Sequence, residues 1–503
     1  MKLIFSVFLI LFPYLIQSST YYVSNQGSNS NTGLYPDSAW ETLQYASDQV
    51  VGGDTVLVLN GNYTGFDLRT SGNPYDPIVF KALSDSVIID NHNPVTNDGI
   101  NIENASWVWV EGFKIIDMPR AGIRAVVGSN ITIRNNFCHQ NYRWGIFTGF
   151  VDSALIEYNE CCYTDDEHGI YFSNSGDYPV IRYNICHHNS CCGIHMNGDE
   201  SMGGDGLISF ASVEGNIIYE NGATGGSGIN CDGVAQSVIF NNLLFFNHAS
   251  GISLYRIDAS AGSYQNKIYN NTIVQAGDAR WALNINTESV DDTVYNNILI
   301  TLHSYRGSIS IDSSSLPGFH SDYNLVNDRM TLDQGNTVIS LAQWQNMGYD
   351  QHSWLAGDYN SIFVNYPSND FHLQSASIAV DNGTSMVNPP VGYDLDSIIR
   401  PQGSGFDIGA YEYSSTGVEN GNITELTSPS LITYKGNQIL FSGLNPLSRI
   451  MVIDLCGRII HQSGIIFNHS YTWQNCENNS GLLFFIIYNQ NTSKAQGKLL
   501  LIH

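Results

Sequence analysis

The sequence predicts an all-β fold, a parallel β-helix, because two short markers recur along its middle with a nearly constant period. The first is the dipeptide Gly-Ile, whose copies are separated by 23, 23, 24, 24, 35 and 23 residues. The second is an Asn that ends a short β-rich run. Repeats of this length indicate a solenoid, in which each repeat buries its apolar face by stacking on its neighbours. The Gly-Ile copies begin at Gly99, Gly122, Gly145, Gly169, Gly193, Gly228 and Gly251, and the second marker falls at Asn136, Asn159, Asn184, Asn216, Asn242, Asn271 and Asn297.

The first 18 residues have the pattern of a secretory signal peptide. Lys2 precedes an apolar run from residue 3 to 16, and small and polar residues follow it. The run is shorter than the roughly 18 apolar residues that span a membrane. We therefore expect export, and no membrane span after cleavage of residues 1–18.

Residues 19–65 are predicted to close the N-terminal end of the solenoid. A strand at Tyr21 is followed by a short amphipathic helix, which Asp37 or Ser38 can cap, and by a buried strand at residues 55–59. Such a segment is needed because the open end of a solenoid exposes core and unpaired strand edges.

The coils themselves are predicted for residues 66–315. In each strand the Ile of Gly-Ile points inward, so the next residue points outward. Coils stack about 4.8 Å apart, and their outward residues therefore form rows.

The marker asparagines are predicted to form an interior ladder of amides, and three cysteines in one repeat slot are predicted to be buried. The buried cysteines are Cys138, Cys161 and Cys186. Of the outward residues, one row contains Tyr171, His195 and Asn230, and a second row beside it contains Ser173, Asn197, Asp232 and Tyr255.

The C-terminal part of the chain has a different organisation. Residues 316–413 lose the period and are predicted to end the β-helix. Residues 414–429, rich in Ser, Gly, Asn and Thr, are predicted to be a linker. Residues 430–503 carry short alternating strands and are predicted to form a small β-sandwich.

The overall charge limits the class of partner. The net charge is −26 with only 20 basic residues, which argues against binding nucleic acid or an anionic membrane surface. Nine cysteines cannot all pair. We expect a monomer, and no cofactor other than Ca²⁺.

Short motifs at both ends resemble those of known families. Residues 21–24 (Tyr-Tyr-Val-Ser), residues 53–56 (Gly-Asp-Thr-Val) and residues 407–413 are similar to the first and last coils of secreted right-handed parallel β-helix proteins. That resemblance implies a secreted protein acting on an extracellular polysaccharide, because the family includes pectate, alginate and chondroitin lyases and several glycosidases. Residues 454–458 (Asp-Leu-Cys-Gly-Arg) and residues 498–501 resemble the sorting domain of the Bacteroidetes type IX secretion system, which implies that machinery as a partner and a secreted or cell-surface location.

Loop lengths predict where a ligand binds. The coils at Gly193 and Gly251 are longer than the others, with the extra residues near 199–210 and 258–263. Long loops on one face of a repeat protein tend to mark its binding face. We therefore expect two walls around the short coil at Gly228, whose floor holds Asn230 and Asp232.

Three functions fit such a strip. In β-elimination a base removes the proton next to a uronate carboxylate, and a cation or polar donors neutralise that carboxylate. This is the favoured reading, although no Lys lies on the strip, which weakens it. The alternatives are glycoside hydrolysis by Asp232 with Asp199 or Asp205, and glycan binding or adhesion without catalysis.

The residues of the lyase hypothesis have defined roles. His195 is the predicted base or acid, Asp232 its carboxylate partner or a cation ligand, and Arg256 the neutraliser. Tyr171 and Tyr255 would stack on sugar or relay protons, and the predicted substrate-binding residues are Asn197, Asp199 and Asn230. If this strip is not the site, the next candidates are Arg120, Arg124, Arg143 and His168.

A Ca²⁺ site is a further prediction. Three consecutive carboxylates, Asp165, Asp166 and Glu167, offer the oxygen ligands that Ca²⁺ prefers. The same run is more typical of a solvated turn.

Overall fold

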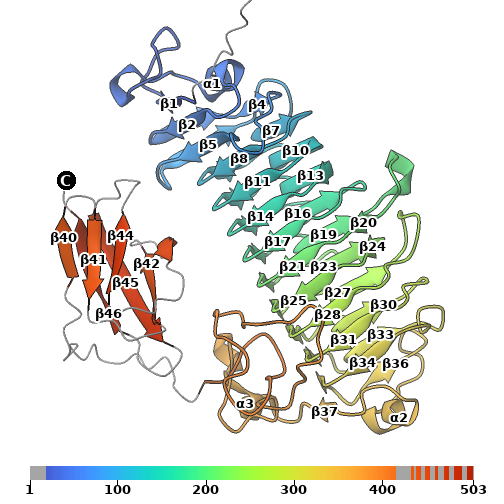
Figure 1. Cartoon of the computed structure of the whole chain (residues 1–503). Helices are drawn as coiled ribbons and strands as arrows, with labels where there is room; N and C mark the ends of the chain where they lie inside the picture. The colour runs from blue at the N-terminus through green and yellow to red at the C-terminus, as the bar shows by residue number, and fades with distance from the viewer. Residues whose placement is uncertain are drawn as a thin grey trace, which may run out of the picture. The chain divides into compact units, whose positions relative to one another are not determined.

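Three long parallel sheets confirm the predicted β-helix (Figure 1). The structure, a computed structural model, describes residues 18–414 and seven strands between residues 432 and 501. The chain divides into two compact units, Met1–Ser415 and Thr416–His503. In the described part of the chain, none of the helices has the length and apolar character needed to cross a membrane.

Each coil contributes one strand to each sheet. Sheet A contains β1 (Thr20–Val23), β2 (Thr55–Val58), β5 (Ile78–Ala82), β8 (Val108–Glu111), β11 (Ile131–Arg134), β14 (Leu155–Glu157), β17 (Val180–Arg182), β21 (Ser212–Glu214), β25 (Val238–Phe240), β28 (Lys267–Tyr269), β31 (Thr293–Tyr295) and β34 (His320–Asp322). Sheet B contains β3 (Gly61–Thr64), β6 (Val87–Asn91), β9 (Lys114–Ile116), β12 (Phe137–His139), β15 (Glu160–Cys162), β18 (Ile185–His187), β22 (Ile217–Tyr219), β26 (Leu243–Phe245), β29 (Thr272–Gln275), β32 (Ile298–Thr301), β35 (Leu325–Val326) and β37 (Trp354–Leu355). Sheet C contains β4 (Phe66–Leu68), β7 (Ile100–Glu103), β10 (Ala121–Ser129), β13 (Trp144–Asp152), β16 (His168–Ser173), β19 (Ile194–Asn197), β23 (Ser227–Asp232), β27 (Ser250–Tyr255), β30 (Leu283–Ile285), β33 (Ile309–Ile311) and β36 (Met330–Thr331).

The N-terminal helix begins later than the sequence suggested. α1 (Leu43–Gln49) is capped by Thr42, whose hydroxyl accepts a hydrogen bond from the Tyr45 N–H. The predicted caps Asp37 and Ser38 instead lie in a separate turn of 3₁₀ helix, η1 (Pro36–Ser38), which Pro36 favours by fixing its own φ. Leu43 and Ala46 of α1 pack into the core at the end of the solenoid.

The last coils of the solenoid lie within residues 316–413, the segment predicted to end the β-helix. Strands β34, β35, β36 and β37 extend all three sheets as far as residue 355. The segments that follow are α2 (Leu341–Asn346), α3 (Tyr359–Ile362), β38 (Phe363–Asn365), η3 (Tyr366–Ser368) and β39 (Asp370–Leu373).

Two predicted segments lie outside the described residues. They are residues 1–17 of the predicted signal peptide and residues 415–431, which include the linker from residue 415 on.

Two antiparallel sheets form the C-terminal unit, as expected of a small β-sandwich. One sheet joins β40 (Ile432–Lys435), β41 (Gln438–Ser442) and β44 (Ser470–Gln474), and the other joins β43 (Ile459–Gln462), β42 (Ser448–Ile453), β45 (Gly481–Asn489) and β46 (Ala495–Leu501).

The predicted register is confirmed by a continuous column of isoleucines in the core of the solenoid. Each Ile of the Gly-Ile marker pairs with the next along sheet C, and every one is fully buried. The cysteine slot of sheet B is likewise buried and pairs in register. The isoleucine column is Ile100, Ile123, Ile146, Ile170, Ile194, Ile229 and Ile252.

The predicted ladder of asparagines is confirmed as well. Each marker Asn donates from its side-chain amide to the side-chain oxygen of the next, as Asn184 does to Asn216 at 3.0 Å. The same amide also donates to a backbone carbonyl, so buried polar groups at the turn are satisfied. A second ladder, in which Asn189 donates to Asn221 and Asn221 to Asn247, was not predicted.

Candidate functional site

Sheet C displays the predicted rows of outward side chains. Tyr171, His195, Asn230 and Ser253 occupy successive positions of one row. Asn197, Asp232 and Tyr255 follow one another in the second row. The rows therefore bring most of the predicted site residues onto one face, and the local contacts determine which of them can meet a ligand.

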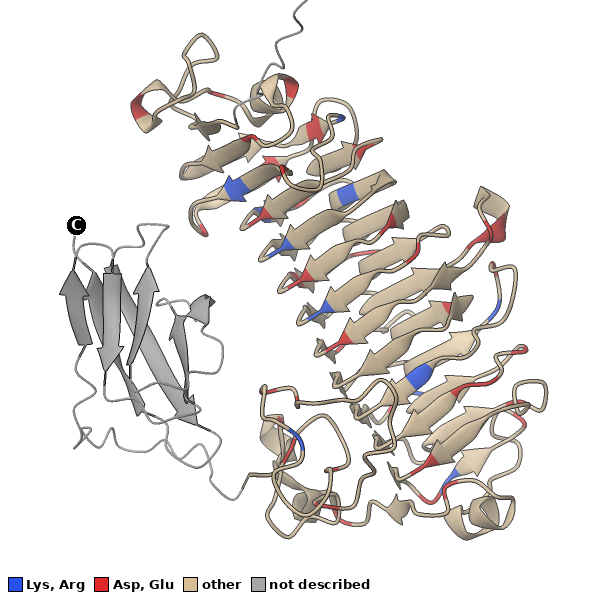
Figure 2. Cartoon of the chain, viewed as in Figure 1, with Lys and Arg blue, Asp and Glu red and all other residues tan. Residues whose placement is uncertain are grey.

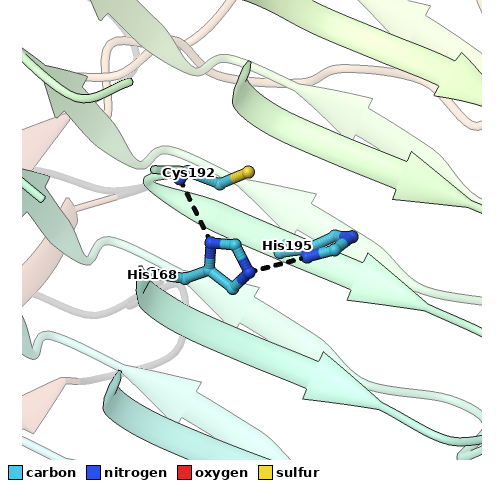
Figure 3. A group of neighbouring side chains, drawn as sticks. All are labelled: His168, Cys192 and His195. Atoms are coloured by element: carbon cyan, nitrogen blue, oxygen red, sulfur yellow. Dashed lines mark hydrogen bonds between the residues drawn. The ribbon is translucent and has the colours of Figure 1, made fainter. Parts of the chain in front are cut away.

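His195 forms a hydrogen-bonded pair with His168 (Figure 3). The His168 Nδ1 accepts a hydrogen bond from the Cys192 backbone N–H at 3.2 Å. Its Nε2 must then carry the proton and donate it to Nδ1 of His195, 2.9 Å away. Burial holds the pKa of His168 well below its usual value and lowers that of His195 to about 3. Both imidazoles are therefore neutral near pH 7, and the remaining His195 nitrogen, Nε2, is buried without a hydrogen-bond partner among the described residues.

Asp232 does not face a ligand. Its carboxylate accepts hydrogen bonds from the backbone N–H groups of Ile257 and Asp258, at 2.8 and 2.9 Å, and more weakly from that of Ala259. The side chain is buried, and this burial raises its pKa against the opposing effect of the N–H groups. Asp232 therefore anchors the loop after β27, a role that the alternation of the strand alone did not reveal.

The two long loops pack against each other and do not form two separate walls. The Glu200 N–H donates to the Asp258 carbonyl at 2.9 Å, and the Ser260 N–H donates to the Gly206 carbonyl at 3.1 Å. At the end of the first loop, the short strand β20 (Ile208–Ser209) pairs with β24 (Val234–Ala235) of the coil at Gly228. The expected cleft over the coil at Gly228, with a loop on each side, is thus wrong, because backbone hydrogen bonds join the loops into one ridge.

A pocket of about 480 Å³ lies on sheet C, over the coils that follow the histidine pair. Two predicted residues line it, Asn230 and Tyr255, and the Asn230 amide donates to the Tyr255 hydroxyl at 2.5 Å. Burial raises the pKa of Tyr255, and the hydrogen bond from Asn230 partly opposes this rise. The remaining lining residues are Gly226, Ser227, Ser250, Ser253, Ile257, Arg280, Trp281, Asn284, Asn286, Arg306, Ser310 and Gln334.

Arg280 and Arg306 give this pocket a positive charge, and neither forms an ion pair with a carboxylate in the described part of the chain. Among the described residues, no partner forms a hydrogen bond or ion pair with the Arg280 guanidinium. Arg306 donates to the Gln334 carbonyl at 3.1 Å and lies over the ring of Tyr305, but it contacts no described carboxylate. Free guanidinium groups are suited to bind carboxylates.

Most other arginines of the solenoid are paired with acids. Figure 2 shows how few basic residues it carries and how often an acidic residue lies beside one. On sheet C, Arg124 binds Glu103, and just before the strands of this sheet Arg120 binds Asp98. Arg256, the predicted neutraliser, binds Glu288 at 3.0 Å. The two pocket arginines therefore differ from most described arginines, which form ion pairs with acidic side chains.

The remaining predicted residues lie outside the pocket. The Asn197 amide donates to the Tyr171 hydroxyl at 3.1 Å, and Tyr171 stacks on His195. Asp199 is the N-cap of η2 (Glu200–Met202), where its carboxylate accepts from the Ser201 N–H.

Two of the three carboxylates of the predicted Ca²⁺ site, those of Asp166 and Glu167, are engaged in other contacts. Arg143 forms ion pairs with Asp166 at 3.3 Å and with Glu167 at 2.7 Å, and Trp144 donates to Glu167. The Asp165 backbone carbonyl accepts from the Ser190 hydroxyl. This arrangement fits the solvated-turn alternative, since Arg143 already supplies the positive charge.

The two pocket arginines occupy a recurring position in the repeat, two residues before the marker Gly, and this position could have indicated them from the sequence. Arg120 and Arg143 lie two residues before Gly122 and Gly145, and Arg280 lies two residues before Ala282, which takes the place of the marker Gly. Arg306 holds the same slot before Ser308. The last Gly-Ile of the series is at Gly251, so the dipeptide alone does not indicate the slots of the two arginines.

Comparison with known proteins agrees with this architecture. A family model described as the right handed beta helix region matches residues 78–205. The solenoid is a right-handed parallel β-helix. No curated protein sequence matches the chain significantly.

Several solved structures are similar to the chain. One is pectate lyase Pel9A, with 16% identity, a TM-score of 0.53, and coverage of 79% of this chain and 97% of that chain. Others are a rhamnogalacturonan lyase (15%, TM-score 0.45, 67% and 87% covered) and an alginate lyase from Paenibacillus sp. str. FPU-7 (15%, TM-score 0.42, 55% and 94% covered). At these identities the likeness shows the fold alone.

Proposed function

We propose that this protein is a polysaccharide lyase that cleaves a uronate-containing polysaccharide by β-elimination in the pocket on sheet C. The observation that carries the proposal is a pair of arginines, Arg280 and Arg306, that have no acidic partner among the described residues and line a pocket that also holds Tyr255. A chain with a net charge of −26 repels an anionic polymer unless local cations bind it. The fold agrees with this proposal, since pectate lyase Pel9A is similar in fold.

The chemistry follows from the side chains that line the pocket. Arg280 and Arg306 would bind the uronate carboxylate and stabilise the negative charge that develops when the neighbouring carbon loses its proton. Tyr255, as phenolate, would accept that proton and then return it to the departing glycosidic oxygen. The carbon–oxygen bond breaks as the new carbon–carbon double bond forms, so no water enters the products. Asn230, which donates to the Tyr255 oxygen, would stabilise the phenolate.

The residues of the pocket support glycoside hydrolysis less well than β-elimination. The reaction needs two carboxylates on either side of the bond. Of the described residues that line the pocket, none is Asp or Glu. Asp232, the first member of the carboxylate pair suggested from the sequence, is buried and occupied by backbone N–H groups.

The reaction can be identified on a panel of neutral and uronate-containing polysaccharides. We expect the absorbance of unsaturated uronate to rise with uronate polymers only, in step with the new reducing ends. Reducing ends without that absorbance would identify a hydrolase. Binding without either signal would identify a non-catalytic glycan-binding protein.

Removing the pocket arginines should weaken substrate binding. A hydrogen bond to a charged group contributes about 1.5–3 kcal/mol, so Arg280→Ala and Arg306→Ala should each raise KM by about 10–100-fold. The matched control is Arg124→Ala, an arginine of the same sheet that is paired with Glu103. Steady-state kinetics on the active polymer provides the measurement. A raised KM for Arg124→Ala with unchanged values for the other two would move the site to the earlier coils.

We also propose that the protein is exported and reaches the medium or the cell surface. The proposal rests on the signal-like residues 1–18 and on the sorting-domain resemblance of residues 430–503. N-terminal sequencing of the mature protein should find residues 1–18 removed, and limited proteolysis should cut within residues 414–429. A full-length cytoplasmic product in the native host would contradict the proposal.

A further inference from the structure

A second cluster of reactive side chains lies on sheet B, in coils that precede the pocket. Strands β12, β15 and β18 place His139, Cys162 and His187 in register on three successive coils. Glu160 lies two residues before Cys162 on β15, on the same outer side of the strand. Imidazole, thiol and carboxylate groups thus meet at one place, and neither the fold nor the proposed lyase reaction uses them.

The distances within this cluster suit a metal ion. The His187 Nε2 lies 3.1 Å from a carboxylate oxygen of Glu160, and the Cys162 Sγ lies 3.3 Å from Nδ1 of His139. One ligand atom each from Glu160, Cys162 and His187 lies within 4.8 Å of the others. In a tetrahedral zinc site, bond lengths of about 2.0–2.3 Å separate the ligand atoms by about 3.3–3.6 Å. Small side-chain rotations would bring the cluster to that geometry.

Surrounding side chains hold the ligands in place. The His187 ring stacks on Tyr219, with ring centres 4.7 Å apart, and its Nδ1 lies 2.8 Å from Nδ1 of His188. This contact turns Nε2 toward Glu160. Cys162 and His187 are buried, whereas Glu160 and His139 are partly exposed. An ion therefore has a route from solvent to ligands that are already oriented.

We propose that Glu160, Cys162, His187 and His139 bind a divalent transition-metal ion of the Zn²⁺ class. Thiol and imidazole ligands select such an ion over Ca²⁺, which prefers oxygen. The ion links three consecutive coils of sheet B and stabilises them, because binding to the folded state alone raises stability by mass action. This metal site is independent of the proposed polysaccharide reaction.

The cluster of His168, Cys192 and His195 on sheet C is the natural comparison. Its three ligand atoms also lie within 4.8 Å of one another. It contains no carboxylate, and Nδ1 of His168 already accepts a hydrogen bond from the Cys192 backbone N–H. The sheet B cluster has four ligands and a negative charge, which favours it as the metal site.

Metal titration of the full-length protein tests the proposal. After chelator treatment under reducing conditions, the protein is titrated with Co²⁺, followed by the thiolate-to-cobalt charge-transfer absorbance, and then with Zn²⁺, which should displace Co²⁺. Loss of a partner outside the first shell weakens metal binding by about 10–100-fold, so loss of a ligand in Cys162→Ser or His187→Gln should weaken it by at least about 100-fold. Zn²⁺ should also raise the melting temperature of the wild type but not of these variants.

The matched control is Cys192→Ser, which removes the thiol of the sheet C cluster. We expect this variant to keep the charge-transfer band and the wild-type affinity. The proposal is overturned if the wild type shows no thiolate band, or if the band is lost in Cys192→Ser and kept in Cys162→Ser. Circular dichroism without metal establishes that each variant is folded, and Glu160→Gln gives a milder second test should Cys162→Ser fail to fold.

Discussion

Replacing Tyr255 with Phe should lower the rate of β-elimination by about 10²–10⁴-fold, the usual contribution of a general acid–base residue. The hydroxyl lies in the pocket and accepts a hydrogen bond from Asn230, and in the proposed mechanism it accepts and returns the proton. The change removes one oxygen and preserves the ring, so the thermal transition should barely move. Initial rates from the absorbance of unsaturated uronate provide the measurement.

Tyr171→Phe is the matched control for this prediction. Tyr171 lies on the same sheet, accepts a hydrogen bond from Asn197 and does not line the pocket. The variant should keep most of the activity. If Tyr171→Phe loses activity and Tyr255→Phe keeps it, the reaction takes place beside His195 instead.

The pH dependence follows from the raised pKa of Tyr255. A group whose pKa is raised stays protonated through neutral pH, so the phenolate base is scarce there and becomes more abundant as pH rises. We expect kcat/KM to increase by about tenfold per pH unit from neutrality until unfolding limits the rate. A rate that is flat between about pH 5 and 8 would contradict a phenolate base with a raised pKa.

Truncating one isoleucine of the core column should strongly destabilise the solenoid. Ile194 is fully buried and pairs with Ile170 and Ile229 on the adjacent coils. Ile194→Ala removes buried methyl groups and leaves a cavity, which should lower the free energy of unfolding by about 2–5 kcal/mol. Denaturant unfolding followed by circular dichroism measures this loss.

Ile399→Ala controls for the substitution itself. Ile399 is 66% exposed, so its truncation should change the free energy of unfolding by less than about 0.5 kcal/mol. Equal effects of the two variants would mean that the column does not support the solenoid and that the inward and outward assignments of sheet C are reversed.

The fold was predictable from the sequence because repetition fixes it. A Gly-Ile pair every 23 or 24 residues specifies both the coil length and the inward face of β16 and β19, and the structure reproduces that register. The ladder through Asn184 was predictable for the same reason. The N-cap of α1 was misplaced because Asp37, Ser38 and Thr42 are all good caps, and only packing against the end of the solenoid selects among them.

The candidate site was less predictable because alternation along a strand says which side a residue faces, not what it contacts. Asp232 faces outward as predicted, yet the loop of residues 257–259 folds back and covers its carboxylate. His195 also faces outward, but His168 engages its Nδ1. Arg280 and Arg306 lie in coils where the marker dipeptide has changed. The marker alone therefore does not indicate their position in the repeat.

A crystal structure of Tyr255→Phe with a bound oligouronate tests the central claim most directly. We predict that a uronate carboxylate contacts Arg280 or Arg306, with the adjacent glycosidic oxygen facing residue 255. An oligosaccharide bound over Tyr171 and His195, with the pocket of Arg280 and Arg306 free of sugar, would contradict the proposed site.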